Sequence, residues 1–288
     1  MSTLFALDFV RSALIVSVIM GLLLSYLGVH VVGRGIVFVD LALGQISMLG
    51  VAFAAFIGED PTVISIVFTL AGAFILSFIK VSDKRLKQEA IIGIIYAFTS
   101  ALTVLLISKT AHGDADISEV LFGSVFTATH KQILWMAGVF GILGLMHFIF
   151  RRRFFEITEH FEQKNLEELG VFNLWNFLFY LSIGLAIVLA VRVGGVIPVF
   201  SYLVVPSVSA ILFTRGKASL VLIALLVSLF GSFFGIYFSV QFDFPAGSSI
   251  VTVLGIIFVL AALFRLVRGR REGAAALAPV EAGRELQA

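Results

Sequence analysis

The side chains with the most chemical potential lie in residues 37–50, an apolar stretch that contains one carboxylate, Asp40, and one carboxamide, Gln45, followed by Ser47. Polar groups inside such a stretch cost free energy in a membrane, and they often mark the path of an ion or substrate. Their oxygen atoms would coordinate a divalent cation weakly and briefly, as a conduit requires. We therefore take Asp40, Gln45 and Ser47 as candidate path residues, with Asp40 and Gln45 as weak metal ligands.

The composition defines the kind of protein that must position these residues. Of 288 residues, 60% are hydrophobic and only 13% are charged, and the mean hydropathy is +1.09. Soluble domains carry about twice this share of charge. The apolar stretches run close to 20 residues, which suits a helix that crosses a hydrocarbon core of ~30 Å better than a barrel strand of ~10 residues. The sequence therefore predicts an all-α, polytopic membrane protein.

Nine apolar stretches are long enough to cross a membrane. They cover residues 9–28, 36–57, 62–80, 91–109, 132–150, 173–193, 197–213, 218–240 and 248–267. Pro198 and Pro206 interrupt the seventh, which could be re-entrant, so we expect eight or nine spans. Residues 1–268 would form one transmembrane domain, and the tail of Ala, Gly and charged residues, 269–288, is expected to be disordered.

Basic residues predict the orientation, because cytoplasmic loops are enriched in Lys and Arg. If the N-terminus lies outside and the C-terminus inside, only four of the 20 Lys and Arg residues fall on the outer side: Arg11, Lys109, Lys131 and Arg192. We therefore expect a multi-pass protein of the bacterial cytoplasmic (inner) membrane. The first stretch lacks a small-residue cleavage site, so it is interpreted as a span and not as a signal peptide.

Several function classes lack the residues that they need. The chain has no Cys, which excludes thiolate metal sites, and its net charge of +2 gives little support to nucleic-acid binding. It contains neither a phosphate-binding G-x-x-x-x-G-K-[ST] motif nor a hydrolase motif, so any ATP would be hydrolysed by a partner and no enzyme is expected. The five histidines lie mostly in loops or near span ends, where surface or interfacial positions are expected.

Glycine rows predict close helix packing, because small residues let membrane helices approach each other. One row is Gly231 and Gly235. Another is Gly138, Gly141 and Gly144, which recur every three residues along one span.

A broken helix is predicted near residues 194–209. Gly194, Gly195 and Pro206 would free backbone carbonyls, and Ser201 and Ser207 add hydroxyls nearby. Membrane helices tolerate such breaks where they line a cavity, or where neighbouring helices satisfy a kink. Ser201, Pro206 and Ser207 are therefore candidate path residues, with a purely structural kink as the alternative.

Residues 151–170 mix glutamates with apolar residues at about helical spacing. This pattern predicts one or two short amphipathic helices on the cytoplasmic face. From spacing alone, an interfacial helix and a docking site for another protein are both open.

The order of these features resembles the permease subunit of ABC importers of the zinc, manganese and iron family, over roughly residues 10–267. Short patterns in a fixed order carry the resemblance: RGIVF (34–38), LG (49–50), IGI (92–94), LFG (121–123), LGV (169–171), VGGV (193–196), LVVPSVSA (203–210) and DFPAGSS (243–249). The resemblance implies the helical fold of metal and vitamin B12 permeases. It also implies a homodimeric or pseudo-dimeric pore, here expected as a homodimer, a separate cytosolic ABC ATPase subunit that hydrolyses ATP, and an extracytoplasmic solute-binding protein.

The resemblance further assigns ATPase docking to the segment 151–170. The residues that it implies are Glu162, Leu166, Leu169 and Gly170. No cofactor bound by the chain itself is implied.

One departure from the family pattern falls on the candidate ligands. The family usually has Asp and His four residues apart, at positions that correspond here to Leu41 and Gln45. Asp40 is one residue early, about 140° around the helix from Gln45. The sequence therefore favours Asp40 as a residue at the cytoplasmic end of the span, paired with Arg34 or capping the backbone, and Gln45 as the residue nearer the middle of the membrane.

Three functions stay open from the sequence. The first is an ABC importer permease for a divalent metal ion: zinc, manganese or iron. The second is the same architecture moving a metal chelate or another small solute. The third is a stand-alone secondary transporter with Asp40 as an ion site, and the docking-like segment 151–170 argues against it.

Overall fold

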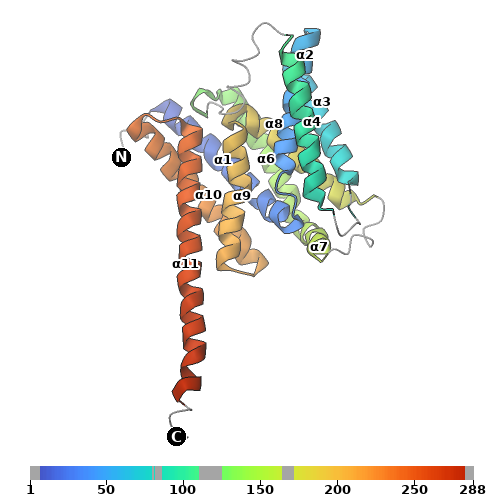
Figure 1. The fold of residues 1–288 in the computed structure, drawn as a ribbon. Coiled ribbons are helices and arrows are strands. Elements are labelled where there is room, and N and C mark those ends of the chain that lie inside the picture. Colours follow the sequence, from blue (N-terminus) through green and yellow to red (C-terminus); the bar gives the residue numbers. More distant parts are fainter. Residues whose placement is uncertain (1–6, 80, 82–85, 110–124, 164–171, 283–288) are drawn as a thin grey trace.

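The computed structural model describes residues 7–79, 81, 86–109, 125–163 and 172–282, which form a bundle of helices (Figure 1). In chain order the helices are α1 (Asp8–Arg34), α2 (Val39–Ile57), α3 (Pro61–Phe78), α4 (Gln88–Ile107), α6 (His130–Ile149), α7 (Arg151–Glu162), α8 (Leu174–Gly194), α9 (Val196–Phe213), α10 (Lys217–Phe242) and α11 (Ala246–Ala282). A short 3-10 helix, η2 (Val125–Thr127), precedes α6. The predicted all-α class is confirmed.

Nine helices of the described ranges, α1–α4, α6 and α8–α11, are long and apolar enough to cross a membrane. They coincide with the nine predicted stretches. The least secure of these, residues 197–213, is the continuous helix α9 with Pro206 inside it. The polytopic membrane class is therefore confirmed, whereas the predicted orientation of the two termini stays a prediction.

Local residue choices explain where spans begin and end. α3 begins at Pro61, and the side chain of Asp60 accepts a 2.6 Å hydrogen bond from the backbone N–H of Thr62, which caps the first turn. This hydrogen bond holds the pKa of the Asp60 carboxyl below its ordinary value. Gly35 directly follows α1 and ends it, because its φ of 66° lies in the left-handed region that glycine favours.

α1 lies at the centre of the bundle and packs on α6, α7, α9 and α10, while α2 packs on α3 and α4 (Figure 1). Large side chains such as Met20, Tyr180 and Tyr202 are fully buried in this core. α4, α6 and α11 bury much less of their apolar surface within the chain. Their outer faces are therefore available to lipid or to other chains.

The two predicted glycine rows differ in the structure. Gly231 and Gly235 lie against side chains of α11, which confirms the close packing predicted for them. At Gly138, Gly141 and Gly144 of α6, no described atom of another helix lies within 4 Å of the place that a Cβ would take. The packing predicted for this second row is wrong for the described part of the chain, because α6 lies at the edge of the bundle.

The last helix, α11, continues to Ala282, beyond the apolar span that ends at Val267, and it extends away from the other helices (Figure 1). The sequence predicted disorder from residue 269. Ala, Glu and Arg are strong helix formers, which explains why a helix can continue there. The predicted domain boundary at residue 268 stays a prediction.

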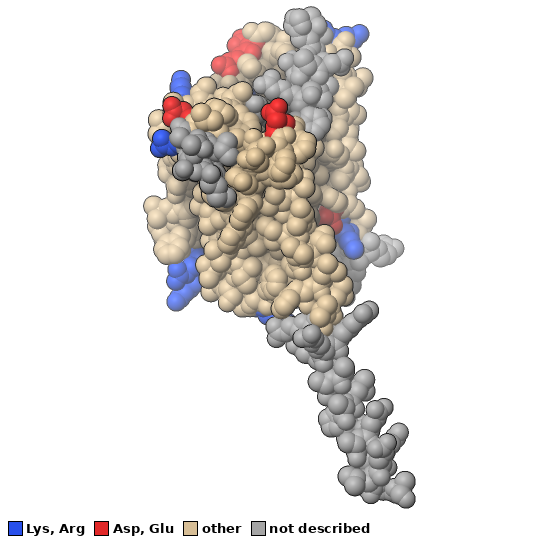
Figure 2. Space-filling view, turned by 90° about the vertical axis from the view of Figure 1, so that its left-hand side faces the viewer, with Lys and Arg blue, Asp and Glu red and all other residues tan. Residues whose placement is uncertain are grey.

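One end of the bundle, which we call the α7 end, comprises α7, the last turns of α1, α6 and α9, and the first turns of α8 and α10. Its described basic residues include Arg34, Arg151, Arg152, Arg153, Arg215, Lys217 and Arg265. On the face in Figure 2, charged residues leave a broad area without charge between them. This distribution suits a membrane protein whose α7 end lies in the cytoplasm.

Candidate functional site

The candidate path residues of α2 do not share one environment. Asp40 lies in the first turn and is 3% exposed, and Ser47, about two turns later on the same side, is 4% exposed. Oδ1 of Asp40 has no hydrogen-bond partner within the described residues. Gln45 is half-buried. The structure therefore places Asp40 and Ser47 together on an inner face of α2. Gln45 lies on a different, more exposed face of the same helix.

Gln45 belongs to a row that is reachable from outside the chain. Leu41, Gln45 and Leu49 follow each other at four-residue spacing and all are half-buried. Packing on α3, α4, α8 and α9 covers other sides of α2. Leu41 and Gln45, the two positions to which the resemblance assigns metal ligands, thus lie together on the accessible side of the helix.

The pairing with Arg34, one of the two roles predicted for Asp40, is wrong. The guanidinium of Arg34 donates hydrogen bonds to Oγ1 of Thr158 (3.2 Å) and Oδ1 of Asn176 (2.9 Å), and its carbon lies 3.6 Å from the ring centre of Phe179. The reason is that α1 continues to Arg34 itself. Its last turn directs this side chain between α7 and α8 rather than toward α2.

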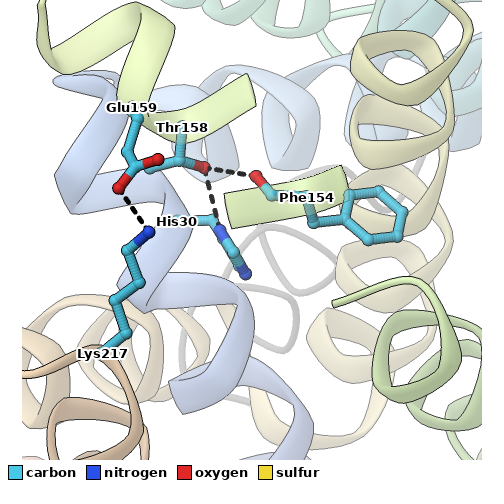
Figure 3. Close-up of polar contacts among 5 residues, drawn as sticks. All are labelled: His30, Phe154, Thr158, Glu159 and Lys217. Atoms are coloured by element: carbon cyan, nitrogen blue, oxygen red, sulfur yellow. Dashed lines mark hydrogen bonds and ion pairs between the residues drawn. The ribbon is translucent and has the colours of Figure 1, made fainter. Parts of the chain in front are cut away.

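Arg34 belongs to a buried polar cluster whose centre is Thr158 of α7. The Thr158 hydroxyl donates to the carbonyl of Phe154 (3.0 Å) and lies 2.9 Å from Nδ1 of His30 (Figure 3). Nε2 of His30 lies 3.2 Å from the hydroxyl of Tyr26. Because these groups have hydrogen-bond partners, except for Nη2 of Arg34, most of the cost of burying them is offset.

Sequence reasoning missed this cluster, although His30 and Arg34 are four residues apart and therefore share one face of the first span. The surface or interfacial role expected for the histidines is wrong for His30 and His147, which are both fully buried. The ring of His147 stacks on Phe154 with ring centres 3.9 Å apart. Aromatic rings surround these polar groups, and both ring nitrogens of His147 and Nη2 of Arg34 have no hydrogen-bond partner within the described residues.

Further hydrogen bonds extend the cluster to α3 and α4. Nδ2 of Asn176 donates to the carbonyl of Ser77 (3.0 Å). Nε2 of Gln88 donates to the carbonyl of Ile79 and to the hydroxyl of Tyr180, each at 2.9 Å. The cluster therefore ties α1, α3, α4, α7 and α8 together, and α7 cannot shift against the spans without breaking some of these bonds.

α7 confirms the predicted amphipathic helix for the described part of residues 151–170. Phe154, Ile157 and Phe161 are buried against the spans, whereas Glu162 is exposed. Partial burial and the neighbouring carboxylate of Glu159 raise the pKa of Glu162 above its ordinary value. An ion pair joins Glu159 to Lys217 of α10 (Figure 3).

The other predicted docking residues, Leu166, Leu169 and Gly170, lie outside the described residues. Docking through this segment therefore stays a prediction.

The junction of α8 and α9 is a break inside the protein. Gly195 has φ 80° and ψ 163°, a conformation that is essentially restricted to glycine. Gly194, Gly195 and Val196 are buried, and Gly194 lies against Met20 in the middle of α1. The predicted break is thus present where protein surrounds the irregular backbone, as a membrane requires.

The serines of α9 are engaged with carbonyls. The Ser201 hydroxyl donates to the carbonyl of Ile197 (2.9 Å), and the Ser207 hydroxyl donates to the carbonyl of Ser25 in α1 (3.1 Å). Pro206 is buried beside them. These contacts suit the alternative of a structural kink, and a path role for Ser201, Pro206 and Ser207 stays a prediction.

Among the described residues, no three His, Asp or Glu side chains gather closely enough to hold a metal ion. Asp40 and Gln45 therefore have no further ligand of these types within the described part of one chain. Any metal contact there would be weak or would involve backbone oxygens or another chain.

The model of the ABC 3 transport family matches residues 6–265. The chain belongs to this family. Among its relatives, the manganese transport system membrane protein MntC of Listeria innocua is 28% identical and covers 91% of this chain and 92% of its own length. The high-affinity zinc uptake system membrane protein ZnuB of Haemophilus influenzae is 25% identical and covers 89% of this chain and 97% of its own length.

A solved structure supports the same assignment. PsaBC from Streptococcus pneumoniae, in complex with a Fab, is similar with a TM-score of 0.74 and 25% identity, over 91% of this chain and 95% of the matched chain. The family predicted from the sequence patterns is therefore confirmed, and so is the permease fold. As a member of the ABC 3 family, the chain is a membrane-spanning transport subunit.

Proposed function

We propose that the chain is the pore-forming permease subunit of an ABC importer that takes up a divalent metal ion: manganese, zinc or iron. Two copies would form the pore, with the N-terminus outside and the C-terminus in the cytoplasm. A cytosolic ATPase subunit would hydrolyse ATP, and a solute-binding protein would deliver the metal on the outer side. In this scheme the chain catalyses no reaction and binds no cofactor of its own.

The accessible row of α2 carries the proposal. A pore between two copies needs polar groups on a face that one copy leaves open, and Gln45 lies on such a face. Its position corresponds to a family ligand, and relatives of the chain are named for manganese and zinc transport. Asp40 is already buried within one chain and would contribute less directly.

The ligands available to an ion along this path are neutral oxygens. The amide of Gln45 offers one, and Pro206 frees the carbonyl of Tyr202, four residues earlier in α9. Ser201 and Ser207 would contribute only after releasing their present carbonyl partners. Weak coordination of this kind allows an ion to leave a site as readily as it enters.

A second candidate is transport of a metal chelate or another small solute by the same architecture. Leu41 favours it, because it puts an apolar side chain where the family usually has Asp. A chelated ion brings its own ligands and does not need that carboxylate.

Uptake measurements separate the two candidates. The chain is expressed with its ATPase and binding protein in a bacterial strain that lacks its own metal importers, and accumulated manganese, zinc and iron are measured by elemental analysis. Uptake of one bare ion supports the first candidate. Uptake only in the presence of a chelator supports the second, and failure of both despite an active ATPase contradicts the proposal.

Two variants of α2 test the path itself. Gln45→His should change the preference among metals severalfold, because imidazole suits zinc and iron better than an amide does. Asp40→Asn, in the same helix but on the inner face, should change it less. Equal and negligible effects would remove α2 from the path.

Co-purification tests the docking segment. Substitutions of Glu162, Leu166, Leu169 and Gly170 should weaken binding of the ATPase, while thermal unfolding shows that the chain is still folded and not destabilised. Gly138→Ala, on the open face of α6, serves as the control. Full ATPase binding and transport in the substituted chain would contradict docking at this segment.

A further inference from the structure

A groove of about 1070 Å³ lies on the outside of the bundle between α1, α6, α7 and α10. This volume lies just above the usual range of ligand pockets, which is roughly 300–1,000 Å³. Its walls along the spans are apolar, with Leu22, Leu23, Phe140 and Val221 among the lining residues. Because α1, α6 and α10 are membrane spans, this part of the groove lies at the depth of the lipid chains.

The α7 end of the groove is charged. The charged residues that line it are Arg151, Arg152, Glu156, Glu159 and Lys217. Lys217 is paired with Glu159, and Glu156 is paired with Arg153, which does not line the groove. Arg151 and Arg152 have no carboxylate partner within the described residues. The α7 end of the groove therefore carries uncompensated positive charge beside the apolar part of the groove.

The wall formed by α6 is open. Gly141 and Gly144 line the groove, and apart from adjacent residues and the backbone of α6, no described heavy atom lies within 4 Å of where their Cβ atoms would be. The side chains described for this protein thus leave space for something else. An occupant must be apolar along the spans and negatively charged at the α7 end.

We propose that this groove binds an anionic phospholipid, with its phosphate at Arg151 and Arg152 and an acyl chain along Gly141 and Gly144. Basic pockets beside transmembrane helices are suited to acidic lipid head groups. A second copy of the chain fits less well, because it would bring the same positive charge to the α7 end of the groove. The bound lipid would bridge α6 and α10 and brace α7 from the side opposite the Arg34 cluster.

Native mass spectrometry of the purified full chain tests the charge requirement. Phosphatidylglycerol should bind more tightly than phosphatidylcholine with the same acyl chains. Combining Arg151→Gln with Arg152→Gln should weaken phosphatidylglycerol binding by about tenfold or more, since each basic residue near an anionic surface contributes about fivefold. Arg215→Gln, at the same end of the bundle but outside the groove and without an ion pair to its lining residues, should leave lipid binding unchanged.

Filling the groove tests its position. Gly141→Leu and Gly144→Leu should abolish phosphatidylglycerol binding, whereas Gly138→Leu, on the same helix but outside the groove, should not. Thermal unfolding without lipid checks that each variant is folded, and added phosphatidylglycerol should then stabilise only the wild type and Gly138→Leu.

Equal binding of the two lipids, or phosphatidylglycerol binding that survives both the arginine and the glycine substitutions, would overturn the proposal. So would conversion of a dimer to a monomer by Gly141→Leu with unchanged lipid binding, which would make the groove an interface between copies.

Discussion

Nη1 of Arg34 lies 2.9 Å from the side-chain oxygen of Asn176, so the last residue of α1 is tied to the first turn of α8. Both residues are buried, with 5% and 1% of their surface exposed. Arg34 has no carboxylate partner in the described part of the chain and depends on neutral acceptors. A buried charge held in this way is sensitive to the loss of any one acceptor.

Asn176→Ala should therefore destabilise the chain markedly. It removes an acceptor from a buried charge, a change that typically costs about 1.5–3 kcal/mol of unfolding free energy. Thermal unfolding of the purified chain in detergent measures the effect. Asn173→Ala is the control, because it removes only the N-cap of the same helix, which typically costs about 1 kcal/mol. If Asn176→Ala were no less stable than Asn173→Ala, the contact with Arg34 would not be important for stability.

The contact of α1 with α9 leads to a second prediction. Gly28 lies against the carbonyl of Leu203, and a Cβ at this position would be 2.7 Å from Oγ of Ser207. Gly28→Ala should force the two helices apart and cost about 1–3 kcal/mol, the range for overpacked sites. The same thermal measurement in detergent detects the loss.

Gly138→Ala is the matched control for Gly28→Ala. Its Cβ would meet no described atom within 4 Å, and alanine favours helix more than glycine does. This variant should be neutral or more stable by up to about 1 kcal/mol. A loss at Gly138 as large as the loss at Gly28 would mean that close packing against α9 does not explain the effect of Gly28→Ala.

The spans could be predicted from the sequence because each is a property of a single segment. Their apolar stretches and their length suffice, even where Pro206 interrupts one of them. Family membership was also predictable, since short patterns in a fixed order carry it. Packing partners were less accessible: the glycines of α6 and those of α10 look alike in sequence, yet only Gly231 and Gly235 meet another helix in the described structure.

The candidate site was less predictable, because it depends on contacts between different helices that the sequence alone does not specify. Arg34 and Asp40 are close along the chain, but the direction of the last turn of α1 sends Arg34 to α7 and α8 instead. Thr158 lies 128 residues from His30 and has no sequence feature that marks it as a buried partner. The angular offset of Asp40 from Gln45 was predictable, because it follows from helix geometry alone.

The cap of α3 predicts a pH-dependent stability difference. The pKa of Asp60 is lower in the folded chain than in the unfolded one, so ionised Asp60 stabilises the fold above about pH 4 and this contribution is lost as the pH falls through the folded-state value. Asp60→Asn should therefore be less stable than the wild type at about pH 7, with a gap that narrows below about pH 4. Thermal unfolding across this range checks it, with Glu59→Gln as the neighbouring control, and a gap independent of pH would contradict the role of the charge.

Glu162 predicts a pH dependence of stability opposite in sign to that of Asp60. Its pKa is raised in the folded chain by partial burial and by Glu159, so the ionised form is less favourable in the folded state than in the unfolded state. The contribution of Glu162 to folding stability is most favourable below its unfolded-state pKa of about 4.3. It declines as the pH rises through the pKa of the folded state. Glu162→Gln should therefore gain stability relative to the wild type as the pH rises toward 7, by a small amount because the side chain is exposed. A relative loss instead would mean that the carboxylate makes a favourable contact in the folded chain.

The same Glu162→Gln variant separates stability from docking. If the carboxylate contacts the ATPase, the substituted chain will bind the ATPase more weakly at about pH 7 even though it unfolds at a slightly higher temperature. Destabilisation cannot explain such a pair of results, because the two effects have opposite signs. Unchanged ATPase binding together with the gain in stability would limit Glu162 to the surface electrostatics of α7 and leave docking to the apolar residues that follow it.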